Sequence, residues 1–458
     1  MPGSVPPPPP AAAVDGGAPS PVAVSGPAHV VRLTLLMAGS CLPILGAVLI
    51  APVLPRMQDH FTSTPGAKAL VPLALTVPAL SLALLAPFAG VIVDRLGRKR
   101  LLIVATVLYA VFGTTPLWLD SLGAIIASRA LVGVAEAAIM TCCTTLIGDY
   151  YSGRQRAKYL ALQAVCTSAS ATAFFVVGGA VGAAGWRVPF WIYAVSLVIA
   201  PLMAAALPSP AARASTHVAR ASTHVARAST HVARASTHVA RASTHVARAA
   251  THKAPAVAMT GSPFPWRRLA GICTLTFFGA MVFYTVPVEM AYLLDDLGVE
   301  DPGTIGPATA IASAATVAGA VIFVRLKRAP EPMLPVVFAV CAAGFGVMFL
   351  AGSAPLLVVG AVVNCLGTGM LLPALLTSAM SRLAFEDRGR GTGLWTSAFF
   401  GGAFVCPLVL LGLESAVGSL AGAVGTLGLA AALVAAGLSA ARRHADAVVP
   451  EPLPEQAA

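Results

Sequence analysis

The sequence predicts an all-α membrane protein with twelve transmembrane helices in two related six-helix bundles. Three observations lead to this prediction. Hydrophobic residues make up 57% of the 458 residues and charged residues only 10%, whereas soluble domains carry roughly a quarter charged residues. Apolar runs long enough to cross a bilayer recur along the chain. The loops between these runs alternate between many and few basic residues, as expected for a chain that crosses a membrane repeatedly.

About twelve apolar runs reach the length of roughly 20 residues that a transmembrane helix needs. We place them near residues 33–55, 69–93, 101–119, 122–148, 159–184, 187–207, 269–293, 304–324, 332–351, 355–380, 392–413 and 417–441. This spacing divides the chain into a Pro-, Ala- and Gly-rich tail (1–30), a six-helix bundle (31–207), a linker (208–266), a second six-helix bundle (267–441) and a short tail (442–458).

Basic residues predict the orientation. If both termini lie in the cytoplasm, the inner loops receive Arg98–Arg100 and most of the other loop cations. The outer loops then receive only Arg56, Lys68 and Arg187. Because Lys and Arg concentrate in cytoplasmic loops, we expect a multi-pass protein of the plasma (inner) membrane with both termini inside.

The two bundles resemble each other in sequence. Arg154-Gln155-Arg156 follows the fourth predicted span, and Arg388-Gly389-Arg390 follows the tenth. Both begin a pattern R-x-R-x-x-x-L at the same place within a six-span half. Two parallel halves related by an axis along the membrane normal are a recurrent plan among membrane transporters.

The linker contains an unusual repeat. Ala-Arg-Ala-Ser-Thr-His-Val occurs five times without change over residues 212–246, and a degraded sixth copy follows. We interpret it as a tandem repeat in a solvated linker. Two alternatives remain open: the arginines could bind anionic lipid, or the histidines could bind metal. Histidines seven residues apart on a flexible chain do not form a preset tetrahedral site, so no metal site is predicted.

Other classes of function find little support in the sequence. The net charge of +11 comes largely from the acid-free linker and the inner loops, so binding of nucleic acid is not expected. The eight cysteines lie in apolar segments without C-x-x-C spacing. No G-x-x-x-x-G-K-[ST], H-E-x-x-H or G-x-S-x-G pattern is present. We therefore expect neither enzymatic activity nor a cofactor.

A basic turn joins the second and third predicted spans. It reads Gly-Val-Ile-Val-Asp-Arg-Leu-Gly-Arg-Lys-Arg over residues 90–100. This stretch resembles the signature loop of major facilitator superfamily transporters, and six of its residues match that pattern: Gly90, Asp94, Arg95, Gly97, Arg98 and Lys99.

The resemblance implies a major facilitator fold and a gating role for this loop. It implies that Asp94 caps the N-terminal end of the eleventh span near Gly391, where the helix dipole favours an anion. It also implies that Asp149, at the inner end of the fourth span, pairs with Arg98 or a neighbouring cation. We predict these residues to be part of a gate and not of a substrate site.

The fourth span carries two charged residues, Arg129 and Glu136. They are seven positions apart and therefore share a helix face, about 10 Å apart along the axis. Arg129 and Gly133 form an R-x-x-x-G element that resembles the drug–proton antiporter branch of the family. Charged groups inside a span are costly and usually functional. We predict that Glu136 carries a coupled proton with the help of Arg129; contact with the substrate and a static polar contact remain alternatives.

Further residues are candidates for a central substrate cavity. They are Gln163, Phe283, Tyr284, Glu289, Asn364, Trp395 and Phe399. For Gln163 and Asn364 a hydrogen bond between helices is an alternative. For Glu289 the alternative is a position near the membrane interface. Each aromatic residue would otherwise face lipid or pack in the core.

The resemblance implies a secondary active transporter that works by alternating access. An apolar cavity with one ionisable residue favours proton-coupled efflux of small lipophilic molecules or drugs, by a monomer in the bilayer. The alternative is an uptake symporter of the same fold for a sugar, an organic acid or another metabolite. A membrane enzyme or a sensor that does not transport is a third possibility, which clustered acids or histidines at a membrane surface would support.

Overall fold

The computed structural model describes residues 27–208, 266–326, 329–384 and 387–448. Residues 1–26 of the predicted tail, residues 209–265 with the repeat linker and the last ten residues lie outside this part of the chain. The described residues form helices and contain no strand. Twelve of the helical segments are long and apolar enough to cross a membrane, which confirms the predicted fold class.

The first half of the molecule runs from α1 to α8. Its elements are α1 (Pro27–Val48), η1 (Ala51–Val53), α2 (Leu54–His60), α3 (Ala67–Leu85), α4 (Ala89–Leu96), α5 (Arg98–Thr114), η2 (Thr115–Leu117), α6 (Leu122–Tyr150), α7 (Gly153–Gly182), η3 (Val188–Ala194) and α8 (Val195–Ala206).

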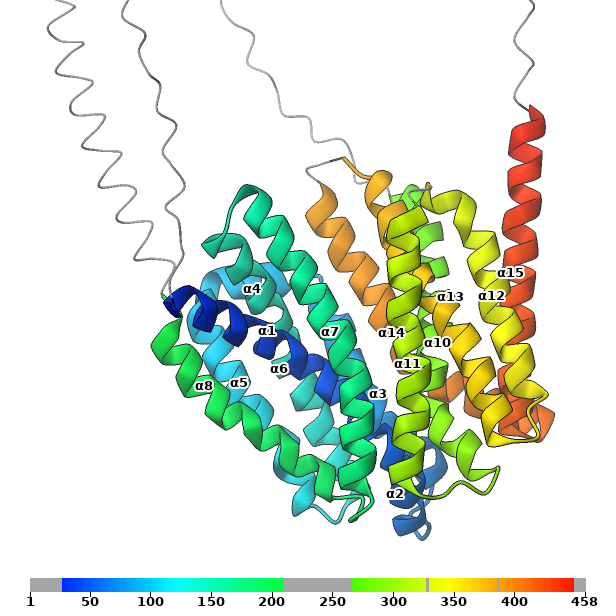
Figure 1. The fold of residues 1–458 in the computed structure, drawn as a ribbon, viewed down its shortest axis with the longest axis horizontal. Helices are drawn as coiled ribbons and strands as arrows, with labels where there is room; N and C mark the ends of the chain where they lie inside the picture. Colours follow the sequence, from blue (N-terminus) through cyan, green and yellow to red (C-terminus); the bar gives the residue numbers. More distant parts are fainter. Residues whose placement is uncertain (1–26, 209–265, 327–328, 385–386, 449–458) are drawn as a thin grey trace, which may run out of the picture.

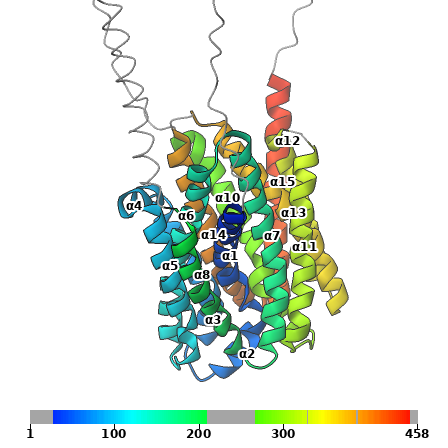
Figure 2. The same ribbon diagram turned by 60° about the vertical axis from the view of Figure 1, so that its left-hand side comes forward.

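The second half runs from α10 to α15. Its helices are α10 (Trp266–Asp295), α11 (Pro302–Leu326), α12 (Pro330–Phe349), α13 (Ala354–Ser381), α14 (Arg388–Val417) and α15 (Leu420–Val448). Figures 1 and 2 show the two halves side by side, with the start of α1 and the end of α15 toward the same end of the molecule.

Each half has its own hydrophobic core. Tyr284 and Tyr292 of α10 pack against both cores. The halves meet along two pairs of helices, α3 with α14 and α7 with α11. At the second crossing, a Cβ atom built on Gly306 would lie 2.8 Å from the Cα atom of Gly179. Glycine at both positions therefore allows the two backbones to touch, as small residues do in membrane helix pairs.

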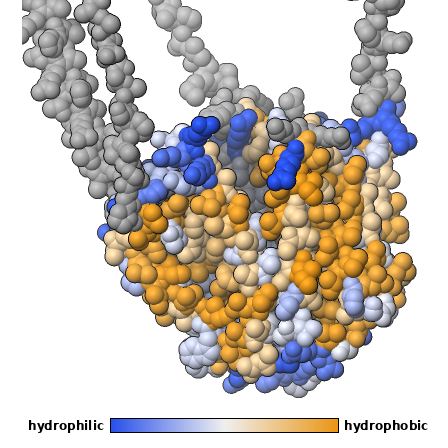
Figure 3. Space-filling model, in the orientation of Figure 1, coloured by the Kyte–Doolittle hydropathy of each residue, from blue (hydrophilic) through white to orange (hydrophobic). Residues whose placement is uncertain are grey.

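The two ends of the bundle differ in charge. We call the end that carries Arg98–Arg100 the basic end and the end that carries Asp295, Asp296 and Asp301 the acidic end. Figure 3 shows an apolar surface between more hydrophilic residues at the two ends. This pattern matches a protein surrounded by hydrocarbon in its middle zone.

The predicted second span, 69–93, is not one continuous helix. It breaks at residues 86–88, between α3 and α4. Pro87 lies in this break. A proline lacks the backbone N–H and disfavours helical geometry in the residue before it. The first span starts at Pro27, whereas the sequence predicted a start near residue 33. Proline is favourable at this place because it fits the first turn of a helix.

Candidate functional site

A cavity lies between the halves, and we call it the central cavity. It holds about 820 Å³ of space not filled by protein atoms. Residues of α1, α7, α10, α11 and α13 line it, and none of them is charged: Ile44, Ala47, Val48, Thr167, Ser168, Ala171, Phe175, Phe283, Tyr284, Val286, Pro287, Thr309, Ser313, Thr316, Val317 and Cys365. Helices from both halves thus enclose a mainly apolar site.

Four of the residues predicted for the cavity form one aromatic cluster. Phe283 and Tyr284 line the cavity. Phe399 of α14 lies 6.1 Å from the Phe283 ring and 5.9 Å from the Tyr284 ring, measured between centroids. Trp395 stacks on Phe399 with an interplanar angle of 4°. The buried Trp395 Nε1 has no hydrogen-bond partner among the described residues, so it is available as a donor.

The cavity lining also carries hydroxyl groups that were not predicted as site residues from the sequence. Thr167 and Ser168 come from α7, while Thr309, Ser313 and Thr316 come from α11. Because Thr309, Ser313 and Thr316 follow an i, i+4, i+7 pattern, they share a helix face. That pattern is visible in the sequence and would have identified this surface, which we call the hydroxyl face.

Arg129 is fully buried within the first half. Its Nε donates to the Ala74 carbonyl at 3.2 Å, its Nη2 to the Gly46 carbonyl at 2.7 Å and its Nη1 to Tyr193 Oη at 2.8 Å. These bonds join α6 to α1, α3 and η3. The guanidinium therefore holds four elements of one bundle together, and no ion pair links it to Glu136 in the described residues.

Glu136 is 2% exposed, and its buried Oε1 has no hydrogen-bond partner among the described residues. The carboxyl group rests against the α-carbon of Gly46, where an added Cβ atom would collide with Oε1. Gly46 belongs to α1, and the neighbouring residues Ala47 and Val48 line the central cavity. One turn of α1 thus lies between the carboxyl group and the cavity.

The remaining predicted cavity residues lie elsewhere. Gln163 donates from Nε2 to Ser40 Oγ at 2.8 Å and to Thr144 Oγ1 at 3.2 Å, within the first half. Asn364 is buried between α12 and α13, where its Nδ2 donates to the Cys341 carbonyl at 3.2 Å. Glu289 lines a separate pocket at the acidic end. None of the three lines the central cavity.

The signature loop forms a small charge network at the basic end. Arg98 pairs with Asp94 at 2.8 Å and also with Asp149 of α6. Gly97 has a φ of +83°, a conformation that glycine adopts readily and that lets the chain turn between α4 and α5. Arg95 and Gly90 are exposed, and Lys99 is half-buried.

The expected contact between Asp94 and the start of α14 is not present in this structure. Asp94 bonds to Arg98 of its own half, and the space beside Gly391 is taken by Leu383. The helix that carries Asp94, α4, packs on α5 and α6. The break at Pro87 separates this helix from α3, which is the helix that does pack against α14.

The sequence profile of the Major Facilitator Superfamily matches residues 36–407, which is most of the chain. The chain belongs to the Major Facilitator Superfamily. This result confirms the resemblance of the signature loop and identifies a multi-pass membrane transporter.

Two curated relatives match parts of this superfamily member. The Tetracycline resistance protein, class C, of Escherichia coli is 30% identical over 168 residues, which cover 36% of this chain and 41% of the relative. Protein spinster homolog 3 of Danio rerio is 28% identical over 186 residues, covering 40% of this chain and 36% of the relative. The matches thus span about two-fifths of these relatives.

The fold of this superfamily member is also similar to a solved structure. A D-xylose-proton symporter matches with a TM-score of 0.69 at 13% identity, over 89% of this chain and 97% of the symporter. At this identity the match shows the fold alone. Both a drug-resistance protein and a sugar symporter are therefore similar to this transporter.

Proposed function

We propose that this protein exports small lipophilic molecules in exchange for protons, by alternating access. The observation that supports this function best is the pairing of an uncharged, aromatic-lined cavity with a buried carboxyl group that has no partner in the described part of the chain. The cavity would hold the substrate, and Glu136 would hold the proton. The name of the tetracycline resistance relative agrees with export of a drug-like compound.

The walls of the central cavity suit a molecule with an apolar body. Phe175, Phe283 and Tyr284 offer ring faces, which bind aromatic compounds and delocalised cations. The hydroxyl face adds groups that can form hydrogen bonds with a substrate. A strongly hydrated ion would lose its water without gaining a counter-charge from the lining residues, so we infer that the substrate is neutral or carries a delocalised charge.

In this proposal, Glu136 couples a proton to the movement of α1. An ionised carboxylate without a partner is costly inside a span, whereas a neutral carboxyl group is tolerated far better. A change in its protonation would alter its contact with Gly46, and therefore the position of the α1 turn that lines the cavity. Arg129 would keep α1, α3, α6 and η3 together through its three hydrogen bonds while α1 shifts.

We infer that the acidic end faces outward and that both termini lie in the cytoplasm, in the plasma membrane. The positive-inside rule supports this orientation. Two ion pairs between described residues join the halves, Arg56–Asp301 at 3.5 Å and Lys68–Glu414 at 2.7 Å, and both lie at the acidic end. We therefore propose that this state is closed to the outside and takes up substrate from the cytoplasm as a monomer.

Uptake of a hydroxylated metabolite with protons is the second candidate. The hydroxyl face supports it, because serine and threonine side chains both donate and accept hydrogen bonds to sugar-like groups. The similarity in fold to a D-xylose-proton symporter is compatible with this alternative. The direction in which a proton gradient moves the substrate distinguishes the two candidates.

The test uses inverted membrane vesicles with an acidic lumen and a fluorescent lipophilic cation. Proton antiport of the dye fills the lumen with it, whereas a symporter for hydroxylated metabolites leaves the dye distribution unchanged. Glu136→Gln should abolish gradient-driven accumulation, while Glu331→Gln, a change at an exposed ion pair with Arg382, should preserve it. Accumulation that is unchanged in Glu136→Gln would remove this residue as the proton carrier.

A further inference from the structure

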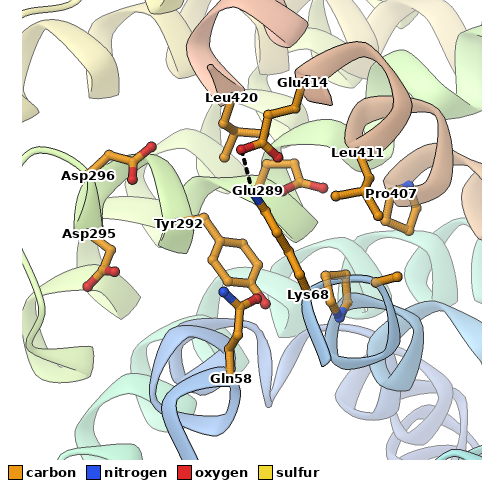
Figure 4. A pocket seen from close by; sticks show the side chains of 12 residues that line it. Gln58, Lys68, Glu289, Tyr292, Asp295, Asp296, Pro407, Leu411, Glu414 and Leu420 are labelled. Atoms are coloured by element: carbon orange, nitrogen blue, oxygen red, sulfur yellow. Dashed lines mark hydrogen bonds and ion pairs between the residues drawn. The ribbon is translucent and has the colours of Figure 1, made fainter. Parts of the chain in front are cut away.

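A second pocket lies at the acidic end, between the halves, and we call it the acidic-end pocket. It holds about 650 Å³ of space between α2, α3, α10, α14 and α15. Figure 4 shows its lining side chains. Its charged residues are one lysine and four carboxylates: Lys68, Glu289, Asp295, Asp296 and Glu414. The pocket therefore carries an excess of negative charge.

Lys68 and Glu414 form the ion pair that crosses this pocket. Their Nζ and Oε1 atoms are 2.7 Å apart, and the dashed line in Figure 4 marks this contact. Lys68 belongs to the first half and Glu414 to the second. The Glu414 side chain is only 20% exposed, so its carboxylate depends on Lys68 for much of its neutralisation.

Glu289 is the second carboxylate beside this lysine. It is 5% exposed and lines the pocket, where Figure 4 shows its carboxyl group near the Lys68–Glu414 contact. Among the described residues it has neither a hydrogen bond nor an ion pair. The hydroxyl oxygen of Tyr292, on the same helix, is buried and also lacks a partner in the part of the chain that the structure describes.

The two carboxylates and the ammonium group belong to opposite halves. Glu289 and Glu414 both move with the second half, whereas Lys68 moves with the first. When the halves part at the acidic end, Lys68 leaves and the adjacent carboxyl groups of Glu289 and Glu414 remain without a cation. Carboxylates in a partly buried site are costly unless a cation pairs with them. The site that loses Lys68 is thus preorganised for another ammonium group.

We propose that Glu289 and Glu414 form a binding site for a protonated primary amine, in which Lys68 is the tethered occupant of the closed state. A primary ammonium group is compact and has three donors, enough for two carboxylates and the free Tyr292 hydroxyl oxygen. No group of three or more His, Cys, Asp or Glu side chains in the described residues is arranged to hold a metal ion. Release of Lys68 during transport rests on the proposed function, but binding of the amine does not.

The test measures binding of methylammonium to the purified full-length protein in lipid nanodiscs. Thermal unfolding midpoints are recorded against methylammonium concentration, with tetramethylammonium chloride keeping the ionic strength constant. In Lys68→Ala the midpoint should rise saturably, because the ligand takes the place of the lysine. Adding Glu289→Gln to this variant should raise the methylammonium concentration needed for half-saturation at least tenfold. The wild type should also bind at least tenfold more weakly, since Lys68 competes.

Arg56→Ala is the matched control. It removes the other ion pair between the halves, with Asp301, but leaves Lys68 on Glu414, so methylammonium should bind this variant no more tightly than the wild type. If Lys68→Ala does not fold, Lys68→Gln replaces it. The proposal is overturned if neither Lys68 variant shows saturable stabilisation, if sodium acts equally well, or if Glu289→Gln leaves the half-saturation unchanged. Because no gradient is applied, this result is independent of whether the protein exports anything.

Discussion

Arg129 and Tyr193 are joined by a hydrogen bond of 2.8 Å, and the guanidinium carbon lies 5.1 Å from the centroid of the tyrosine ring. This pair links α6 to η3 inside the first half. Both side chains are fully buried. The relationship gives Arg129 a structural role that its position in a transmembrane span does not reveal, and it leads to the first prediction.

Arg129→Lys should destabilise the first half strongly. A lysine ammonium cannot reach the carbonyls of Ala74 and Gly46 and the Tyr193 hydroxyl group with the geometry of the guanidinium fork. Buried groups left without partners cost about 1–3 kcal/mol each. We therefore expect the free energy of unfolding to fall by about 3 kcal/mol in total. Tyr193→Phe removes the bond from Arg129 and the long 3.5 Å bond that the Tyr193 hydroxyl donates to the Gly46 carbonyl, and should cost about 2 kcal/mol. Equal stability of Arg129→Lys and the wild type in thermal unfolding would contradict this role.

Gly46→Ala should impair proton coupling without preventing membrane insertion. The new methyl group would collide with Oε1 of Glu136, so the carboxyl group has to leave its position against α1. We expect gradient-driven transport to fall at least about tenfold, which corresponds to roughly 1.4 kcal/mol. Gly412→Ala is the control, because nothing lies within 4 Å of a Cβ atom there. An equal loss in both variants would show that the effect is not specific to Glu136.

Gly306→Val should weaken closure at the acidic end. Its Cβ atom would lie 2.5 Å from the Phe175 carbonyl oxygen, so α7 and α11 could not approach as closely as they do. Overpacking of this kind costs about 1–3 kcal/mol. A cysteine-reactive probe should then label the introduced cysteine of Arg56→Cys faster when Gly306→Val is also present. The control combines Arg56→Cys with Gly437→Val, because Gly437 has open space around it. Identical labelling rates would contradict the prediction.

The two ion pairs between the halves should differ in strength. Lys68–Glu414 is shorter than Arg56–Asp301, 2.7 Å against 3.5 Å, and Glu414 is better shielded from water than Asp301. Exposed pairs contribute about 0–1 kcal/mol. Double-mutant cycles of thermal stability should therefore give a coupling near 1 kcal/mol for Lys68–Glu414 and below about 0.5 kcal/mol for Arg56–Asp301. The reverse order would show that burial of Glu414 does not strengthen its pair.

Asp296 should make stability depend on pH. It lies in the loop after α10, where partial burial raises the pKa of its carboxyl group, Glu414 raises it further and Lys68 lowers it. Because this pKa is higher in the folded protein than in the unfolded chain, the contribution of Asp296 to stability is complete below about pH 4 and is lost as the pH rises.

Asp296→Asn should therefore stabilise the protein at neutral pH, by less than about 1 kcal/mol because solvent screens this charge. The advantage should disappear as the pH is lowered toward about 4, since wild-type Asp296 is then protonated in both the folded and the unfolded state. Unfolding midpoints of the two proteins across this range check the prediction. A variant that is less stable than the wild type at neutral pH would contradict it.

Some site residues were predicted from the sequence because their chemistry is local. Phe283 and Tyr284 lie next to each other on one span, and the charges of Arg129 and Glu136 stand out in an apolar helix. Gln163 and Asn364 show the limit of this reasoning. Each is a polar residue in a span, but hydropathy does not tell whether such a residue faces a cavity or a neighbouring helix. Packing within each half gave both of them partners there.

The sequence by itself determined the number of spans, the superfamily and the unequal charge of the two ends. These features depend on runs of apolar residues, on a short motif and on loop charges, and none of them requires knowledge of which helices touch. Only the tertiary structure decided that Lys68 meets Glu414 across 346 positions and that Arg129 bonds to Tyr193. It also decided that Glu136 and Glu289 find no partner within the described residues. Contacts between helices depend on how two halves pack in three dimensions, and the pattern along one helix does not encode that packing.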